Sequence, residues 1–332
     1  MVTEAAYHIP FRIGVKTICN YKVAQTNTDV TGRCNDMSDY VLSCCSPVDL
    51  TPAWLEERSI RSVPFNYVLD GVWHKDDFGK TIAPKELYRR MLAGEDASTS
   101  QVGVGDYVTY FRSMLDQGLD VVHVTLSGGL SSTYNSAHIA ADSLKDEYSD
   151  RTIDLVDSLC ASAGYGLLMD RMAELKAEGM DAAALAAWAK EHRLEVNHLF
   201  CSGDLTFFVK GGRIKPLAGR VGSLLKICPL MHVDTTGSLE VKEKIRTEAR
   251  CRQAMLEKMA ELAEGGTSYS GKVFISNSEC LDSATELACS IIEKFPNIAD
   301  GDAHIFDIGA TIGVHTGPGT VALFFWGSPE RW

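Results

Sequence analysis

The chain has 332 residues, of which 45% are hydrophobic and 23% are charged, and its formal net charge is −12. This composition is typical of a globular enzyme or binding protein that is long enough for two domains. The acidic balance argues against nucleic acid as a partner, because binding a polyanion needs clustered Lys and Arg. It also argues against strong adhesion to anionic membranes.

Nothing in the sequence indicates export or membrane insertion. No apolar run reaches the length of a membrane span. The first residues, MVTEAAYHIPFRIG, lack the positive start and apolar block of a secretory signal. We therefore expect a cytoplasmic protein whose ten cysteines are reduced thiols. No two cysteines have C-x-x-C spacing, and we expect no metal site.

Residues 1–38 are polar and lack apolar periodicity, so we expect an irregular N-terminal extension. An α/β domain is expected over residues 39–158. Its predicted strands are 39–45, 63–69, 120–126 and 152–158, and its predicted helices are 84–94, 107–117 and a segment with Tyr134 to Leu144 on its apolar face. Strands that alternate with helices in this way predict βαβ units and a mainly parallel sheet.

A second α/β domain is expected over residues 159–332. Because no low-complexity linker separates the two domains, we expect them to pack closely. The predicted helices are 163–176, a segment capped by Asp181, and 282–295. The predicted strands are 196–201, 273–278, 303–309 and 320–326.

The turn LSGGLSS, residues 126–132, stands between a predicted strand and the following helix. Glycines and serines there present backbone N–H groups and hydroxyls at the partially positive helix N-terminus, which favours an anion such as a phosphate or carboxylate. In parallel sheets this edge is also where ligands bind. Two interpretations stay open: Ser131 or Ser132 only caps the helix, or the cap also binds a ligand.

Two further segments carry polar groups at points where the chain turns. In ASTSQVG, the hydroxyls of residues 98–100 precede a helix, where they either cap it or face a ligand. In VKGGRIKP, Gly211-Gly212 forces a turn that projects Arg213 between two lysines. This basic cluster is either a solvated turn or a contact for phosphate or an acidic partner.

The segment HTGPGT near the C-terminus combines a histidine with a sharp bend. Gly317-Pro318-Gly319 fixes the bend, because proline pre-sets one backbone angle and glycine accepts angles that other residues avoid. His315 is either a packing or surface residue or part of a site that a distant segment completes.

Familiar catalytic motifs are incomplete in this sequence. Residues 129–133, GLSST, fall one glycine short of the G-x-S-x-G nucleophile turn. Residues 103–105, GVG, lack the third glycine of a dinucleotide fingerprint, and there is no P-loop. We therefore expect no nucleotide-binding apparatus.

Five short motifs follow one another within residues 40–327: TSQ from Thr99, LSSTYNSA from Leu130, VDS from Val156, KGGRI from Lys210 and HTGPG from His315. Together they resemble the DegV family, the bacterial fatty-acid-binding proteins that serve as carrier subunits of fatty acid kinase (FakB type). The resemblance implies two closely packed α/β domains with a ligand tunnel between them and a mainly parallel sheet in the N-terminal domain.

The resemblance also implies a site in which hydroxyls and a histidine bind the carboxylate of a long-chain fatty acid. The implied ligands are Thr99, Ser100, Ser131, Ser132, His315 and Thr316. Arg213 lies outside this head-group set and is implied near the kinase partner and the phosphorylated product. No catalytic residue, metal or cofactor is implied. The implied partners are the fatty acid and the kinase subunit, and transient contact with a membrane surface stays open.

Three positions depart from the family pattern. Ser132 stands where the family has the glycine of LSGT, and we expect it to reshape the head-group pocket. Cys45 replaces the aspartate of an N-terminal TDS motif, so any function of that carboxylate is lost. Cys228 replaces the lysine of an IKP motif near the expected partner surface. These changes leave ligand binding expected and make kinase partnering an open question.

Three functions remain as hypotheses. The leading one is a non-catalytic carrier that presents a fatty acid carboxylate to an ATP-binding kinase, which forms the acyl phosphate. The second is a lipid hydrolase with Ser131 as nucleophile and His315 as base. The third is a lipid sensor without a kinase partner.

Overall fold

The parallel sheet predicted for the N-terminal part is present. The computed structural model describes residues 40–214 and 227–332, so the predicted extension over 1–38 lies outside the described residues. The first sheet has the order β2-β1-β6-β7, and all of its strand pairs are parallel. Its strands are β1 (Tyr40–Cys45), β2 (Ile60–Val63), β6 (Asp120–Thr125) and β7 (Ile153–Asp157).

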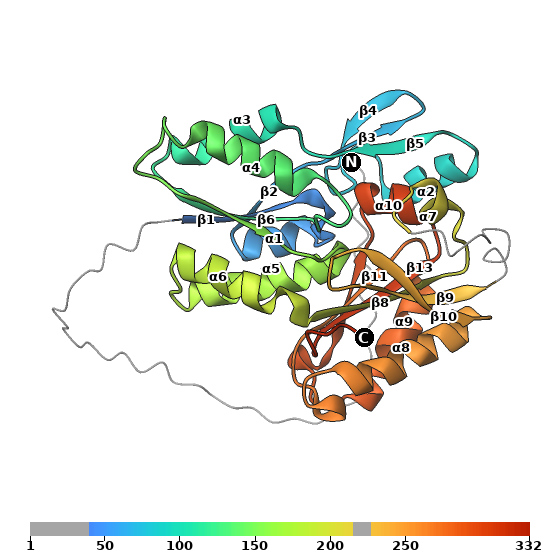
Figure 1. Ribbon diagram of the computed structural model, residues 1–332. Helices are drawn as coiled ribbons and strands as arrows, with labels where there is room; N and C mark the ends of the chain where they lie inside the picture. Colours follow the sequence, from blue (N-terminus) through green and yellow to red (C-terminus); the bar gives the residue numbers. More distant parts are fainter. Residues whose placement is uncertain (1–39, 215–226) are drawn as a thin grey trace, which may run out of the picture. The chain divides into compact units, whose positions relative to one another are not determined.

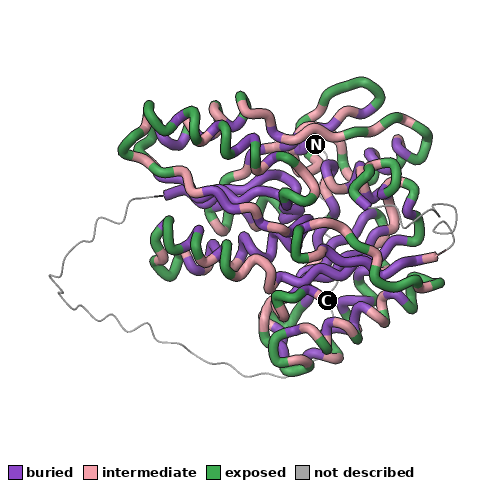
Figure 2. The backbone as a smooth tube through the Cα atoms, viewed as in Figure 1, coloured by how far each residue is buried: buried purple, intermediate pink, exposed green. Residues whose placement is uncertain are grey.

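Helices cover both faces of this sheet: α3 and α4 lie on one side, and α5 and α6 on the other (Figure 1). As a result β1 and β6 are buried along their whole length (Figure 2). A strand buried on both faces needs a continuous apolar run, which is why these strands can be predicted. The helices of this part are α1 (Pro52–Glu57), α3 (Val104–Leu115), α4 (Thr133–Leu144), α5 (Ser162–Ala177) and α6 (Ala182–His192).

A small antiparallel sheet, β4-β3-β5, changes one sequence prediction and excludes one of two open interpretations. Its elements are β3 (Asn66–Leu69), β4 (Val72–Lys75), β5 (Ala97–Ser100) and the adjoining helix α2 (Pro84–Leu92). The strand predicted over 63–69 is confirmed for residues 66–69, but it does not extend back to Val63, where β2 ends. Pro64 has no N–H to donate to a strand ladder, so the chain breaks there. The hydroxyls of residues 98–100 lie on a strand rather than at a helix cap.

The second large sheet has the order β10-β9-β8-β13-β11-β12 and is antiparallel except for the β11–β12 pair. Helices α8 and α9 cover one face, and α5 contacts the other (Figure 1). The strands are β8 (Val196–Ser202), β9 (Cys228–Val233), β10 (Leu239–Ile245), β11 (Val273–Asn277), β12 (Ala303–Asp307) and β13 (Thr320–Trp326). The helices are α8 (Glu248–Leu262) and α9 (Leu281–Lys294).

Four of the described helices were not predicted from the sequence: α1, α8 and the short helices α7 (Thr206–Lys210) and α10 (Ala310–Thr316). His315 therefore lies in the last turn of a helix, and the bend begins only at Gly317, whose φ is 66°. Among the described residues, no helix is both long and apolar enough to cross a bilayer.

The helix α5 joins the two large sheets. The Tyr165 hydroxyl donates to the carbonyl of Val124 and accepts from the N–H of Cys45, at the ends of β6 and β1. The same helix packs against β8, β11 and β13. One hydrophobic cluster runs through both regions, and it includes Leu42 and Phe324. The domain boundary near residue 158 falls between β7 and α5, and the division into two domains stays a prediction.

Gly164 in α5 provides a test of this close packing. A Cβ atom at Gly164 would lie 2.5 Å from Cδ1 of Phe324 and would also meet the His198 ring. We expect Gly164→Ala to lower the free energy of unfolding by about 1–3 kcal/mol, because overpacking outweighs the gain in helix propensity. The control is Gly105→Ala on α3, where a Cβ meets no atom within 4 Å. It should stabilise by about 0.5–1 kcal/mol in urea unfolding. Equal effects of the two variants would contradict the packing argument.

Candidate functional site

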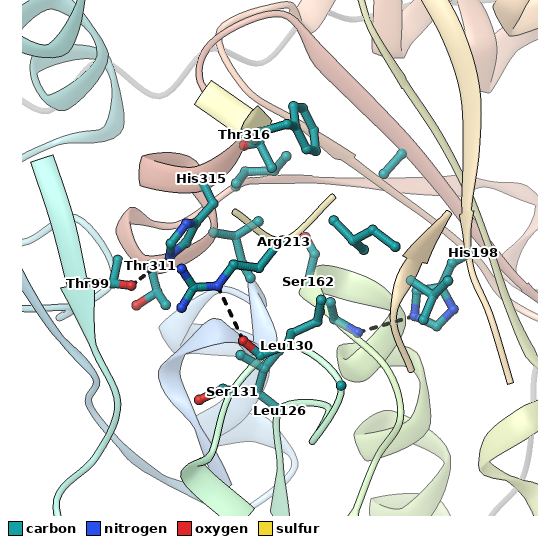
Figure 3. Close-up of a pocket in the computed structure, with 18 of the residues that line it drawn as sticks. Thr99, Leu126, Leu130, Ser131, Ser162, His198, Arg213, Thr311, His315 and Thr316 are labelled. Carbon is teal, nitrogen blue, oxygen red and sulfur yellow. Dashed lines mark hydrogen bonds between the residues drawn. The ribbon is translucent and has the colours of Figure 1, made fainter. Parts of the chain in front are cut away.

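A cavity of about 570 Å³ lies where β5, the turn after β6, α10 and the inner face of the six-stranded sheet meet. One end is polar, and the rest of the lining is mainly apolar (Figure 3). The apolar lining is formed by Phe65, Leu126, Phe200, Phe208, Val233, Leu239, Ile308, Ile312, Ala322 and Phe324. The lining residues of β8 (His198 and Phe200) and of β13 (Thr320, Ala322 and Phe324) are spaced two apart, as the alternation of a strand requires. The lining suits an apolar molecule with one polar end.

Thr99 and His315 form the centre of the polar end, although they are 216 positions apart in the sequence. Thr99 Oγ1 lies 2.7 Å from His315 Nε2 (Figure 3). Burial lowers the pKa of His315 to about 4, and the positive charge of Arg213 adds to this effect. The imidazole is therefore neutral at pH 7. Its Nδ1 is buried and has no protein partner among the described residues.

The structure shows which of the two serines caps the helix α4. Ser131 Oγ accepts the N–H of Thr133 at 3.2 Å, so it caps the first turn of α4. Ser132 occupies the N-cap position but makes no side-chain cap bond. Both residues line the cavity. The helix N-terminus thus faces the cavity, and its orientation favours an anion.

The turn itself is held rigidly. Ser127 Oγ donates to the carbonyl of Gly237 at 2.8 Å and accepts the N–H of Gly129 at 3.1 Å. A Cβ on Gly129 would come within 2.7 Å of the Gly237 backbone. Glycine is needed here because the turn lies directly against the β9–β10 hairpin.

Arg213 lies on the wall of this same cavity, close to the residues of the head-group set. Its Nη1 donates to the carbonyl of Gly211 at 2.6 Å, and its Nε donates to the carbonyl of Leu130 at 3.4 Å (Figure 3). Among the described residues that line the cavity it is the one Lys or Arg. Sequence reasoning separated Arg213 from the head-group set. The structure brings it to the same polar end, while its side chain stays exposed.

The remaining implied ligands also line the cavity. Ser100 Oγ and Thr316 Oγ1 make only weak bonds of 3.4 Å to nearby carbonyls, so both hydroxyls are available. Gln101 was not predicted as a site residue, although it is part of the TSQ motif. It lines the cavity and donates from Nε2 to Ser136 Oγ at 2.8 Å, which ties β5 to α4.

Two buried carboxyl groups behind the cavity wall were missed by sequence reasoning. Asp49 accepts from Ser162 Oγ at 2.5 Å and from the N–H of Gly309 at 3.0 Å. Asp76 accepts from Thr311 through Oγ1 at 2.5 Å and through its N–H at 3.2 Å. Since Ser162 and Thr311 line the cavity, these carboxyls orient its wall. Burial raises the pKa of Asp76, and it raises the pKa of Asp49 to about 7, to which the charge of Asp76 contributes.

His198 closes the cavity away from Thr99 (Figure 3). Its Nε2 accepts the N–H of Ala161 at 3.3 Å, and its Nδ1 lies 3.0 Å from the carbonyl of Val196. Both nitrogens are therefore satisfied by backbone groups. Burial also lowers the pKa of His198 well below its ordinary value. The ring acts as a neutral part of the wall rather than as a second polar end.

The three departures from the family pattern have different locations. Ser132 lies in the cavity wall. Cys45 is buried behind the wall, with Sγ 3.2 Å from the Tyr107 hydroxyl and 3.7 Å from His123 Nε2. Burial raises the pKa of Cys45 to about 11 and lowers that of His123 to about 3, so both groups are neutral. Cys228 is only 3% exposed, so the expectation that it lies at a partner surface is wrong.

The hydrolase arrangement of Ser131, His315 and an acid is not formed within the described residues. His315 Nε2 bonds to Thr99 rather than to Ser131. A catalytic triad also needs an acid that orients the histidine, whereas Nδ1 of His315 has no partner in the part of the chain that the structure describes.

The fold and the cavity define a mixed α/β protein with a largely apolar pocket that is polar at one end. The chain belongs to the DegV family: the family model described as "Uncharacterised protein, DegV family" matches residues 46–327. A DegV domain-containing protein of Clostridium perfringens is 31% identical over 295 residues, which are 89% of this chain and 100% of that protein.

Solved structures show the same fold. A fatty-acid-binding DegV family protein from Thermus thermophilus is 26% identical, with a TM-score of 0.77 over 87% of this chain and all of that one. A DegV lipid-binding protein from Thermotoga maritima is also 26% identical, with a TM-score of 0.74 over 89% of this chain and all of that one.

Asp49 predicts a pH dependence of stability. Its folded pKa of about 7 lies above the ordinary carboxyl value, so between about pH 4 and pH 7 the folded state holds a proton that the unfolded state releases. The contribution of Asp49 is thus fully present below about pH 4 and is lost as the pH rises towards 7. We expect Asp49→Asn to flatten the fall in the free energy of unfolding across this window, measured by urea unfolding. The exposed Asp146→Asn serves as control, and an unchanged pH profile in Asp49→Asn would refute the argument.

Proposed function

We propose that this protein is a non-catalytic carrier that binds one long-chain fatty acid in the cavity and presents its carboxylate to a separate fatty acid kinase. The observation that carries the proposal is the asymmetry of the cavity, from Phe200 and Phe324 in the apolar part to Thr99, His315 and Arg213 at the polar end. The Thermus thermophilus and Thermotoga maritima relatives, which bind fatty acid and lipid, support the choice of ligand.

The free energy of binding a fatty acid has two main contributions, one from its alkyl chain in the apolar part of the cavity and one from its carboxylate at the polar end. Each buried methylene contributes about 0.8 kcal/mol, so ~14 methylenes give roughly 11 kcal/mol before the costs of binding. Burying a carboxylate without partners would cancel much of this gain. Hydroxyls, a neutral imidazole and a helix N-terminus supply hydrogen bonds, and Arg213 supplies the positive charge.

Presentation to a kinase is supported by the position of Arg213. Its side chain is exposed and yet lines the polar end, so it can contact both a bound carboxylate and a group outside the cavity. A guanidinium matches phosphate oxygens through paired hydrogen bonds. Arg213 is therefore suited to the acyl phosphate that the kinase would form. Under this proposal the kinase supplies ATP and the chemistry, and this chain needs no cofactor. Transient contact with a membrane surface would load the carrier.

The alternatives are weaker. A hydrolase needs the Ser131–His315–acid arrangement that the described residues do not form. A lipid sensor would use the same cavity without a kinase, and turnover with the kinase separates it from the carrier.

His315 provides the test of ligand binding. We expect the wild-type chain to bind one palmitate or oleate, seen by native mass spectrometry. His315→Ala should weaken binding by about 1.5–3 kcal/mol, because a donor to a buried charge is lost. The exposed His138→Ala is the matched control. A wild-type chain that stays free of fatty acid at saturating ligand would overturn the proposal. Unchanged affinity in His315→Ala would place the carboxylate elsewhere.

Variants of Arg213 and the wild-type protein, assayed with the kinase, distinguish a carrier from a lipid sensor. With the cognate kinase and ATP supplied, we expect Arg213→Ala to reduce acyl-phosphate formation by more than its loss of fatty acid affinity, measured at saturating fatty acid. Arg213→Lys should rescue little, because an ammonium group cannot reproduce the paired hydrogen bonds. Lys210→Ala is the control, since Lys210 pairs with Asp96 at the surface. Wild-type protein that binds fatty acid but supports no turnover would identify a sensor.

A further inference from the structure

Three cysteines that are scattered in the sequence meet in the second large sheet. Cys201 lies near the end of β8, Cys228 begins β9, and Cys251 is on α8, which packs on both strands. Their Sγ atoms all lie within 4.8 Å of one another. Cys201 is 2% exposed, Cys228 3% and Cys251 0%. No spacing rule detects such a group, because each residue comes from a different element.

The cluster of three cysteines lies on the side of the sheet that faces away from the cavity. Phe200 on β8 lines the cavity, so its neighbour Cys201 points to the opposite face. Cys201, Cys228 and Cys251 all belong to the hydrophobic cluster under α8 and α9. The group is thus separate from the polar end of the cavity and from every residue of the proposed fatty acid site.

The donor set restricts the ion that could occupy this position. Metal–sulfur bonds are about 2.3 Å, so three sulfurs around one ion lie roughly 4 Å apart, which the observed limit of 4.8 Å permits. No histidine nitrogen or carboxylate oxygen of the described residues joins the three sulfurs. Structural zinc sites are almost always four-coordinate, whereas thiolates select soft ions and Cu(I) is satisfied by three of them.

We propose that Cys201, Cys228 and Cys251 form a three-thiolate site for Cu(I). Binding breaks three S–H bonds, forms three Cu–S bonds and releases three protons to solvent, while copper remains Cu(I). The positive charge of Arg252 acts on Cys228 and offsets part of the negative charge of the site. Because the ligands come from two strands and one helix, the ion would cross-link α8 to the sheet.

Buried cysteine is also common as a small apolar residue, and this is the reading that the experiment must exclude. The full-length chain is titrated with Cu(I) without oxygen, in competition with the chromogenic chelator bicinchoninate. We expect one copper per chain. Cys201→Ala and Cys251→Ala should each lower Cu(I) affinity at least about tenfold, with folding checked by circular dichroism. X-ray absorption of the wild-type copper protein should show three sulfur neighbours at about 2.3 Å.

The controls address the other thiols of the chain. Cys289→Ala removes an exposed thiol, and the double variant Cys19→Ala/Cys34→Ala removes the two cysteines outside the described residues. Both variants should bind copper as the wild type does. Wild-type affinity in folded Cys201→Ala or Cys251→Ala overturns the site. Nitrogen or oxygen neighbours in the X-ray spectrum do the same, even if no cysteine variant folds. A tightly held zinc that Cu(I) cannot displace would overturn the choice of ion.

Discussion

The buried carboxyl groups of Asp49 and Asp76 need hydrogen-bond donors, and this requirement fixes the position of α10. Both side chains belong to the part of the chain that precedes the second large sheet, and both accept from residues at the start of α10, Gly309 and Thr311. Burying a polar group without a partner costs on the order of a few kcal/mol. If α10 moved away, Asp49 would lose the N–H of Gly309 and keep only Ser162 as a donor, and Asp76 would lose both donors of Thr311 and keep only Ser46. The helix is therefore anchored at its first turn.

The other end of α10 carries the polar end of the cavity. Because the first turn is anchored, His315 in the last turn is held where its ring hydrogen-bonds directly to Thr99 on β5. Burial keeps this histidine neutral, and the positive charge comes from a separate turn that carries Arg213. Hydrogen bonding and charge are thus supplied by different elements. The helix α10, which carries His315, is largely buried and is anchored at its first turn. The turn that carries Arg213 is exposed.

The parallel sheet could be predicted from the sequence, because strands buried on both faces, such as β1 and β6, read as continuous apolar runs. The strand β10, LEVKEKI, could not, because four of its seven residues are charged and a bulge between Val241 and Glu243 breaks the alternation that would indicate a strand. The motif resemblance placed Thr99 and His315 in one site, whereas periodicity alone could not join residues on β5 and α10. Asp49 and Asp76 gave no signal, because a lone aspartate after a strand usually means a turn. Arg213 was not assigned to the head-group site from the sequence. A Gly-Gly turn predicts that the next side chain projects from the chain, but it does not predict which group that side chain faces.

The strand β8 has a consequence for how this family can vary. Its successive side chains point alternately to the two faces of the sheet: Phe200 lines the cavity, and Cys201 lies in the core beneath α8. Substitutions can tune either face independently, since each side chain meets only one of them. An insertion or deletion of one residue is different, because it would exchange the two faces over the rest of the strand. Changes in the length of this segment should therefore be confined to the loops that flank Val196 and Ser202, while the strand itself keeps its length.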